Sequence, residues 1–336
     1  MKKLTIMGAG SWGLTLAWLY GNAMASRGVE VCLWSRSKDK IETLKQTPQI
    51  TFPVSLTLPP TLQLTHNVAE AVENADIIYL VVSSSGTRSV LEQMKETRRV
   101  NPQSILINAS KGLELPSLKS LSTVILEEFP DNPIGVLSGP TLAPEIVKGL
   151  PTAAVIAAYD IHLAEYLQAH LSTETLRLYS NTDLVGVEWG GTLKNIFAIV
   201  SGYMHAQSLG DNAISALITR GLAEMTRISL TMGAKQETLY GLSGLGDLLA
   251  TCNSPYSRNF QVGFGLAQGK DLQTVLTELN MVAEGVRTTQ AVSQLSDQLK
   301  LDTPIVKTVE MCFSSVISPE ILIKSLMSRK LRSESF

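Results

Sequence analysis

The chain has 336 residues, of which 44% are hydrophobic and 17% charged, and its formal net charge is −2. The hydrophobic content excludes intrinsic disorder, and the small net charge argues against a nucleic-acid partner, which would require a large basic excess. No apolar run approaches the ~20 residues of a membrane-spanning helix, so we do not expect an integral membrane protein. Three widely spaced cysteines form no metal or disulfide pattern, so we expect a cytoplasmic protein that binds no metal.

At roughly 150 residues per domain, the length predicts two domains. In the first half, short apolar runs alternate with segments of helical length, and several runs are apolar on both faces, as parallel strands covered by helices are. This alternation predicts a doubly wound α/β domain over residues 1–185. The predicted strands are residues 3–7, 29–34, 77–82, 104–108, 134–137, 153–157 and 175–179, with clear helices at 12–26 and 87–98.

Helical spacing dominates after about residue 183, and strand-like runs largely disappear. Long helices are predicted at residues 184–204, 213–232 and 284–299, so we expect residues 186–336 to form an all-helical domain. A stretch rich in glycine, serine and asparagine at residues 241–259 interrupts these helices. Loops held by a rigid scaffold often carry function.

The first predicted strand leads directly into a G-x-G-x-x-G turn, from Gly8 to Gly13. In such a turn Gly8 permits the tight bend, Gly10 lets the backbone approach a pyrophosphate, and Gly13 lets helix and strand pack closely. The N-terminus of the following helix offers free N–H groups and a partial positive charge to the anion. This context favours a Rossmann-type dinucleotide site over a simple tight turn.

The end of the second predicted strand indicates which dinucleotide is bound. A carboxylate at this point would bind the adenine ribose of NAD, but the chain reads Trp34-Ser35-Arg36-Ser37-Lys38. Arg36 and Lys38 are suited to pair with the 2′-phosphate of NADP, and Ser35 or Ser37 to hydrogen-bond it. We therefore favour NADP as the cofactor, with NAD as the alternative.

Five further segments combine polar side chains with glycines, and for each a functional interpretation competes with a structural one. The first ends a predicted strand and contains Lys111, which either faces the ligand cleft at the carboxyl edge of the sheet or is a surface lysine. The second, from Ser138 to Ala143, contains Thr141, which either binds substrate or caps a helix.

The third segment places Gly190 and Gly191 inside a predicted helix, although each glycine lowers helix stability by about 1 kcal/mol relative to alanine. Close packing or a nearby ligand would offset that loss. Lys194 follows in an apolar stretch, and a partly desolvated lysine has a lowered pKa that suits proton transfer near neutral pH. The alternative is a lysine whose side chain extends to the surface.

The last two segments lie in the interrupted region. Asp247 follows two glycines and either orients the catalytic lysine or caps a helix. Ser257-Arg258-Asn259 precede a helical run, and these residue types at a helix start form a phosphate or carboxylate site. The alternative is a helix N-terminus with a solvated arginine.

Taken together and in this order, the segments resemble the bacterial NAD(P)-dependent glycerol-3-phosphate dehydrogenase family, over nearly the whole chain. The matching stretches are GAGSWG at Gly8, SKGLE at Ser110, SGPTLAPE at Ser138, GLPTA at Gly149, GVEWGGTLKN at Gly186, LITRGLAEM at Leu217, GLSGLGDLLATC at Gly241, SRN at Ser257 and VAEGVRT at Val282. The sequence departs from the family pattern at Ser83, where many members have proline, at Pro144, where a charged residue is common, and around residues 51–54.

The resemblance implies roles for residues at the matching positions. Lys194 would be the proton donor and acceptor, and Lys111 and Asp247 would complete the catalytic group. The residues implied in substrate binding are Lys111, Gly139, Thr141, Lys194, Asp247, Thr251, Ser257, Arg258 and Asn259. The residues implied in cofactor binding are Gly8, Gly10, Ser11, Trp12, Gly13, Arg36, Lys111, Ala143, Arg258, Val282 and Glu284.

The resemblance also implies a reaction and an assembly. The expected reaction is reversible hydride transfer between NAD(P)H and dihydroxyacetone phosphate, which yields sn-glycerol 3-phosphate for glycerophospholipid synthesis, and the expected assembly is a homodimer. Two alternatives are a related two-domain reductase acting on another small ketone or hydroxy acid, and a dinucleotide-binding protein without catalysis.

Overall fold

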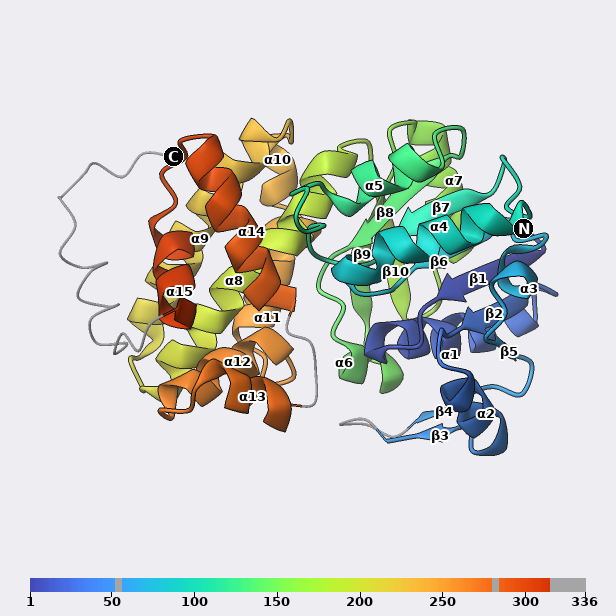
Figure 1. Ribbon diagram of the computed structural model, residues 1–336, viewed down its shortest axis with the longest axis horizontal. Coiled ribbons are helices and arrows are strands. Elements are labelled where there is room, and N and C mark those ends of the chain that lie inside the picture. The colour runs from blue at the N-terminus through green and yellow to red at the C-terminus, as the bar shows by residue number, and fades with distance from the viewer. Residues whose placement is uncertain (52–55, 280–283, 315–336) are drawn as a thin grey trace.

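The computed structural model describes residues 1–51, 56–279 and 284–314. Its first half is an eight-stranded sheet with the order β10-β9-β8-β7-β6-β1-β2-β5, and its second half is helical (Figure 1). The strands are β1 (Lys3–Met7), β2 (Glu30–Trp34), β5 (Gln63–Thr65), β6 (Ile77–Leu80), β7 (Ile105–Asn108), β8 (Ile134–Ser138), β9 (Thr152–Ala157) and β10 (Leu176–Asn181). All seven strands predicted from the sequence are therefore present, with ends that shift by at most a few residues.

Helices connect most of these strands and cover the sheet (Figure 1). They are α1 (Ser11–Ala25), α2 (Lys38–Gln46), α3 (Val68–Val72), α4 (Thr87–Thr97), α5 (Leu121–Glu128), α6 (Ala143–Val147) and α7 (Ile161–Leu171). β1, β6, β7 and β8 are buried along their whole length, as strands with helices on both faces are. The carboxyl ends of the central strands consequently meet at one edge, where ligands bind in such sheets.

The structure differs from the predicted parallel sheet in its last two strands. β9 runs antiparallel to β8, and β10 is parallel to β9. The segment between β8 and β9 contains only the five-residue helix α6, whereas a parallel crossover needs an element that spans the length of the sheet. The chain therefore turns back beside β8, and the first six strands alone form the parallel Rossmann order.

Three short strands were not predicted. β5 is an edge strand of three residues, and the two-residue strands β3 (Gln49–Ile50) and β4 (Leu56–Thr57) form a separate hairpin. Each is too short and too polar to show an alternating pattern in the sequence.

The second half is built around the long helix α8 (Leu184–Ala206). The other helices are α9 (Asp211–Thr231), α10 (Gln236–Leu239), α11 (Asp247–Cys252), α12 (Arg258–Ala267), α13 (Leu272–Glu278), α14 (Glu284–Gln298) and α15 (Pro304–Ser314). A π-helical turn, η2 (Leu242–Gly246), precedes α11. Nearly every residue of α8 is buried, because α9, α11, α12, α14 and α15 surround it.

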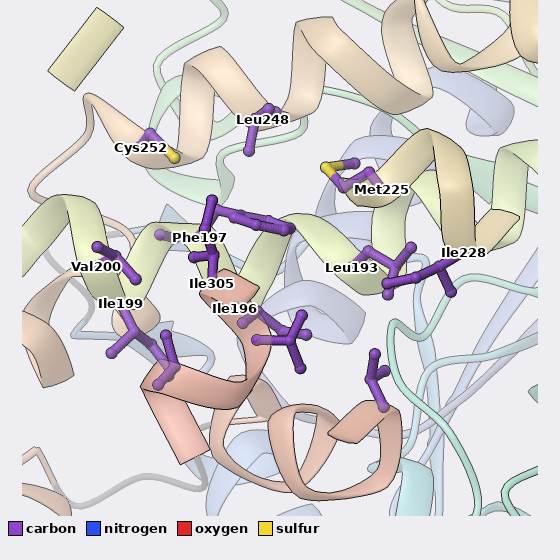
Figure 2. Close-up of a cluster of buried hydrophobic side chains, with 14 of the residues drawn as sticks. Leu193, Ile196, Phe197, Ile199, Val200, Met225, Ile228, Leu248, Cys252 and Ile305 are labelled. Carbon is purple, nitrogen blue, oxygen red and sulfur yellow. The ribbon is translucent and has the colours of Figure 1, made fainter. Parts of the chain in front are cut away.

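The core of the helical half lies around the apolar residues of α8. Figure 2 shows Phe197 on this helix facing Met225 of α9 and Leu248 of α11, and Leu193 beside Ile228 of α9, whereas Ile196 points to the other side. A helix that is apolar all round must be covered on all sides. The few polar residues of α8, such as Glu188 and Lys194, are buried with the rest of the helix, so each of them requires an internal partner.

The crossing of α8 and α12 depends on two glycines. A Cβ atom on Gly202 would lie 1.9 Å from the Phe260 carbonyl oxygen, and one on Gly263 would lie 1.7 Å from the Ile199 carbonyl oxygen. The two helix backbones thus approach more closely than any side chain would allow. This contact fixes the N-terminus of α12 relative to α8.

Gly263→Ala is expected to lower the free energy of unfolding by about 1–3 kcal/mol, because the methyl group forces the two helices apart. Gly246→Ala is the matched control, since a Cβ atom there would find its nearest neighbour at 3.6 Å. Thermal unfolding of both variants by circular dichroism tests the prediction. Equal melting temperatures for the two variants would contradict it.

Candidate active site

The glycine turn after β1 has the shape that an anion site requires. Gly8 has φ +128°, and a Cβ atom there would lie 2.5 Å from the Val81 carbonyl oxygen. A Cβ atom on Gly13 would lie 1.8 Å from the Gly8 carbonyl oxygen, whereas one on Gly10 would find no atom within 4 Å. No side chain caps the N-terminus of α1, which begins at Ser11. The turn therefore leaves backbone N–H groups and open space in front of Gly10, which fits a pyrophosphate.

The other residues expected at the cofactor lie at neighbouring strand ends. Trp12 is part of the first turn of α1, and Arg36 is exposed just beyond the end of β2. Ser37 accepts a hydrogen bond from the Lys40 N–H as the N-cap of α2, so its side chain shapes this loop. Ala143 begins α6, beyond the end of β8.

Lys194 is buried on α8, with 7% of its surface exposed. Its Nζ donates hydrogen bonds to Asp247 Oδ1 at 2.7 Å and to Thr251 Oγ1 at 2.5 Å. Both partners lie on α11, directly after the π-helical turn. The lysine therefore does not extend to the surface, and Asp247 orients it instead of capping a helix.

The same carboxylate also binds Lys111 from the other half of the molecule. Lys111 Nζ donates to Asp247 Oδ2 at 2.5 Å and to the Gly139 carbonyl oxygen at 3.1 Å. Thr141, whose hydroxyl donates to the same carbonyl, does not cap α6, since Leu142 is the N-cap. The residues predicted as the catalytic group thus lie together at the boundary of the two halves.

The two glycines of α8 make this proximity possible. A Cβ atom on Gly190 would lie 2.6 Å from the Ser243 carbonyl oxygen, in the π-helical turn. A Cβ atom on Gly191 would lie 2.2 Å from Ser138 Oγ, at the end of β8. Close packing, which was one of the two predicted explanations, therefore offsets the loss of helix stability at these positions.

The surroundings tune the acidity of Lys194. Burial lowers its pKa to about 8, the negative charge of Asp247 opposes this shift, and the positive charge of Lys111 adds to it. A lysine with this pKa changes its charge near neutral pH, as a proton donor and acceptor must. The neighbouring thiol of Cys252 is inert by comparison, because burial raises its pKa to about 12.

The segment from Ser257 to Asn259 begins α12, as predicted. Ser257 is the N-cap and accepts a hydrogen bond from the Phe260 N–H, and Asn259 Oδ1 accepts one from the Gly285 N–H at 3.0 Å. The hydroxyl hydrogen of Ser257 and the amide NH₂ of Asn259 are donors. Together with the Arg258 guanidinium they form a set of donors suited to an anion.

Arg258 is exposed to solvent, but nearby protein atoms still remove part of the water around its guanidinium group. Desolvation lowers the pKa of its guanidinium, and the nearby Glu284 carboxylate opposes this shift. Glu284 itself accepts hydrogen bonds from Ser84 N at 3.2 Å and from Ser84 Oγ at 2.7 Å. It therefore links α14 to the turn after β6 across the boundary of the two halves. Val282, also expected at the cofactor, lies outside the described residues.

Comparison with known proteins agrees with this arrangement. A family model described as the NAD-dependent glycerol-3-phosphate dehydrogenase N-terminus matches residues 3–164, and one described as its C-terminus matches residues 183–324. The chain belongs to this family.

Individual relatives cover almost the whole chain. A glycerol-3-phosphate dehydrogenase [NAD(P)+] from Synechococcus sp. (strain JA-3-3Ab) is 41% identical over 99% of this chain and 97% of the relative. One from Geobacter sulfurreducens is 40% identical over 99% of each chain. The crystal structure of glycerol-3-phosphate dehydrogenase from Coxiella burnetii superposes with a TM-score of 0.91 at 33% identity, and the match covers 98% of this chain and 99% of that one. Within the described part of the chain, the helices are too short or too polar to cross a membrane.

Sequence reasoning missed the buried carboxylate of this enzyme's α8. Glu188 Oε1 accepts hydrogen bonds from Asn108 Nδ2 at 2.9 Å and from the Ser122 N–H at 2.8 Å. Burial raises the pKa of Glu188, and the hydrogen bonds from Ser122 oppose this shift. The available signal was the single acidic residue of a mostly apolar helix, which requires internal partners when it is buried.

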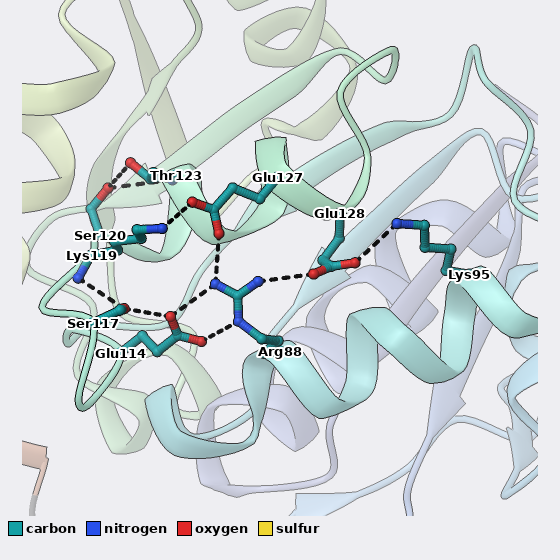
Figure 3. Close-up of polar contacts among 9 residues, drawn as sticks. All are labelled: Arg88, Lys95, Glu114, Ser117, Lys119, Ser120, Thr123, Glu127 and Glu128. Carbon is teal, nitrogen blue, oxygen red and sulfur yellow. Dashed lines mark hydrogen bonds and ion pairs between the residues drawn. The ribbon is translucent and has the colours of Figure 1, made fainter.

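An ion-pair network on the surface holds the end of the segment that carries Lys111. Figure 3 shows Arg88 of α4 between three carboxylates, which belong to Glu114, Glu127 and Glu128. The bond to Glu114 is bidentate, with distances of 2.6 and 2.9 Å, and the three carboxylates raise the pKa of Arg88. Because Glu114 lies three residues after Lys111, the network fixes the outer end of that segment to α4 and α5.

Proposed function

We propose that the enzyme reduces dihydroxyacetone phosphate to sn-glycerol 3-phosphate with NADPH or NADH, and that it catalyses the reverse reaction. The observation that carries this proposal is the buried amine of Lys194, which is held by Asp247 and Thr251 beside Lys111. The family to which the chain belongs supports the choice of substrate and cofactor. The expected homodimer and the expected supply of glycerophospholipid synthesis stay predictions.

The fit of the cofactor rests on the turn from Gly8 to Gly13, whose backbone N–H groups and open space suit a pyrophosphate. When bound, the nicotinamide supplies or accepts the hydride. Arg36 is positioned to distinguish NADP from NAD, since it is exposed beyond β2 with no acidic residue beside it in the sequence.

The residues around Lys194 then perform the proton transfer. As an ammonium group, Lys194 donates a proton to the oxygen of the ketone as negative charge develops there, and its neutral amine removes the hydroxyl proton in the reverse direction. Asp247 holds Lys194 and Lys111 by separate carboxylate oxygens. Lys111 also places a second positive charge near the developing alkoxide, which stabilises the transition state.

The substrate phosphate is assigned to Ser257, Arg258 and Asn259. These residues start α12, which the glycine contact fixes against the helix that bears Lys194. Binding energy from a phosphate held there aligns the reacting carbon with the lysine.

The turnover number for ketone reduction is expected to be constant well below pH 8 and to fall above it. Reduction needs the ammonium form of Lys194, and this group, whose pKa is about 8, loses its proton as the pH rises. The oxidation of glycerol 3-phosphate needs the neutral amine, so its turnover number should rise through the same pH range. Initial rates followed by NADPH absorbance in both directions test this. Lys194→Met should lower both turnover numbers by about 10²–10⁴-fold while still binding NADPH, and equal pH profiles for the two directions would refute the assignment.

Arg258→Ala is expected to raise the KM for dihydroxyacetone phosphate at least about tenfold, since a charge-assisted hydrogen bond contributes roughly 1.5–3 kcal/mol. The weak reduction of dihydroxyacetone, which lacks the phosphate, should change far less. Arg220→Ala, at an exposed position on α9, is the control. An unchanged KM for the phosphorylated substrate would remove the phosphate assignment.

Arg36→Ala is expected to raise the KM for NADPH about tenfold and to leave the KM for NADH unchanged, because only NADPH carries the 2′-phosphate. Lys45→Ala, an exposed position on α2, serves as the control. Steady-state kinetics with each cofactor provide the comparison, and an equal effect on both cofactors would argue against NADP preference through Arg36.

A further inference from the structure

The segment that carries Lys111 has no regular secondary structure of its own. It leaves β7 at Asn108 and continues without helix or strand through Gly112, whose φ is +150°. A loop of this kind does not fix the position of a lysine by itself. Its geometry depends on the side chains that bind its peptide groups.

Two side chains of α8 supply that binding on either side of Lys111. Glu188 Oε1 accepts from Asn108 Nδ2 at 2.9 Å, and Asn108 Oδ1 in turn accepts from the Ser110 N–H at 3.0 Å. Thr192 Oγ1 accepts from the Gly112 N–H at 3.2 Å. Glu188 and Thr192 lie one turn apart on the helix, and both are buried. The peptide N–H groups on either side of Lys111 are therefore connected to α8, that of Gly112 directly and that of Ser110 through Asn108, while the Ser110 hydroxyl donates to the Val82 carbonyl at 2.6 Å.

We propose that Glu188 and Thr192 are positioning residues, which hold the Lys111 segment on the same helix that carries Lys194 and so set the distance between the two lysines. This inference rests on the proposed function, in which Lys111 and Lys194 act together on one substrate. Neither residue touches the reacting atoms, and each acts through the loop.

The hydrogen bonds of Glu188 predict which substitutions are tolerated. Oε1 accepts from two N–H donors, Asn108 Nδ2 and Ser122 N, so it must remain an acceptor. Oε2 is bonded to the hydroxyl of Ser122, which can accept as well as donate. Glutamine can therefore preserve all three hydrogen bonds, whereas methionine removes them and leaves buried N–H groups unpaired.

Displacement of Lys111 would change the pKa of Lys194. The positive charge of Lys111 is one of the causes that lower the pKa of Lys194, beside burial, while Asp247 raises it. The nearby Cys252 thiol stays neutral, because burial raises its pKa to about 12. If Lys111 moves away, the pKa of Lys194 rises, and the pH at which reduction begins to fall moves upward with it.

Glu224 provides a matched control. It is also a buried carboxylate that accepts backbone N–H groups, those of Ile305 and Val306 at the start of α15. It binds no part of the Lys111 segment. Substitution of Glu224 therefore shows how the removal of a buried carboxylate from the helical half affects stability and turnover when Lys111 is not displaced.

The experiment compares wild type with Glu188→Met, Glu188→Gln, Thr192→Val, Thr192→Ser and Glu224→Met. Hydrogen exchange of the peptide that spans residues 108–114 is measured by mass spectrometry, together with turnover number, KM, pH profile and melting temperature. In Glu188→Met and Thr192→Val, hydrogen exchange in this peptide is expected to be faster and the turnover number to be about tenfold to a hundredfold lower. The pH at which reduction begins to fall should also be higher in both variants. Glu188→Gln and Thr192→Ser should resemble wild type, and Glu224→Met should lower only the melting temperature.

Three results would overturn the proposal: unchanged exchange in both disruptive variants, faster exchange with unchanged turnover and pH profile, or the same kinetic changes in Glu224→Met. If Glu188→Met does not fold, the same measurements on Thr192→Val test the proposal alone, since this substitution removes one hydrogen-bond acceptor while keeping the shape of the side chain. A wild-type enzyme that does not reduce dihydroxyacetone phosphate would instead contradict the proposed function, and hydrogen exchange would still decide whether α8 holds the segment.

Discussion

The site depends on one buried carboxylate that two lysines share. One carboxylate oxygen of Asp247 accepts a hydrogen bond from Lys194 and the other accepts one from Lys111, and the side chain is almost completely buried. Removing charges from water is unfavourable unless they are paired and hydrogen-bonded. Without Asp247 the two ammonium groups would repel each other in a poorly solvated space, so the lysines can lie close together only because the carboxylate lies between them. The interaction also joins the two halves of the chain, because Lys111 follows a strand and Lys194 lies on α8.

The helical half can be understood as the support for that carboxylate. Gly190 and Gly191 bring α8 against the π-helical turn and the end of β8, and Gly202 and Gly263 bring it against α12. The apolar core around Phe197 then fixes these contacts (Figure 2). One rigid helix thereby determines the position of Lys194 and of the α12 N-terminus. Preorganisation of this kind matters because a displacement of about 1 Å can lower a rate by roughly a hundredfold.

Much of this architecture could be predicted from local patterns. The glycine turn, the apolar strands and the long helices produce strong periodic signals, and the fold class follows from them. The antiparallel pairing of β9 with β8 could not be predicted, because strand direction depends on the path of the connecting chain and not on strand composition. The Glu284–Ser84 and Glu188–Asn108 hydrogen bonds join residues far apart in the sequence, and a single sequence does not reveal such partners. The sequence likewise leaves open whether Lys194 is buried, because its partner Asp247 lies 53 residues further along the chain.

The distribution of charge shows how a chain of net charge −2 can still offer a site for an anion. At the boundary of the two halves, Lys111 and Lys194 share the single carboxylate of Asp247, and Arg258 lies near Glu284. Glu284 also accepts hydrogen bonds from Ser84, in the turn after β6. Two lysines on one carboxylate leave an excess positive charge, in surroundings where electrostatic interactions are stronger than in water. Acidic residues elsewhere balance the total charge, so an anionic ligand at this boundary encounters the local field and not the overall composition.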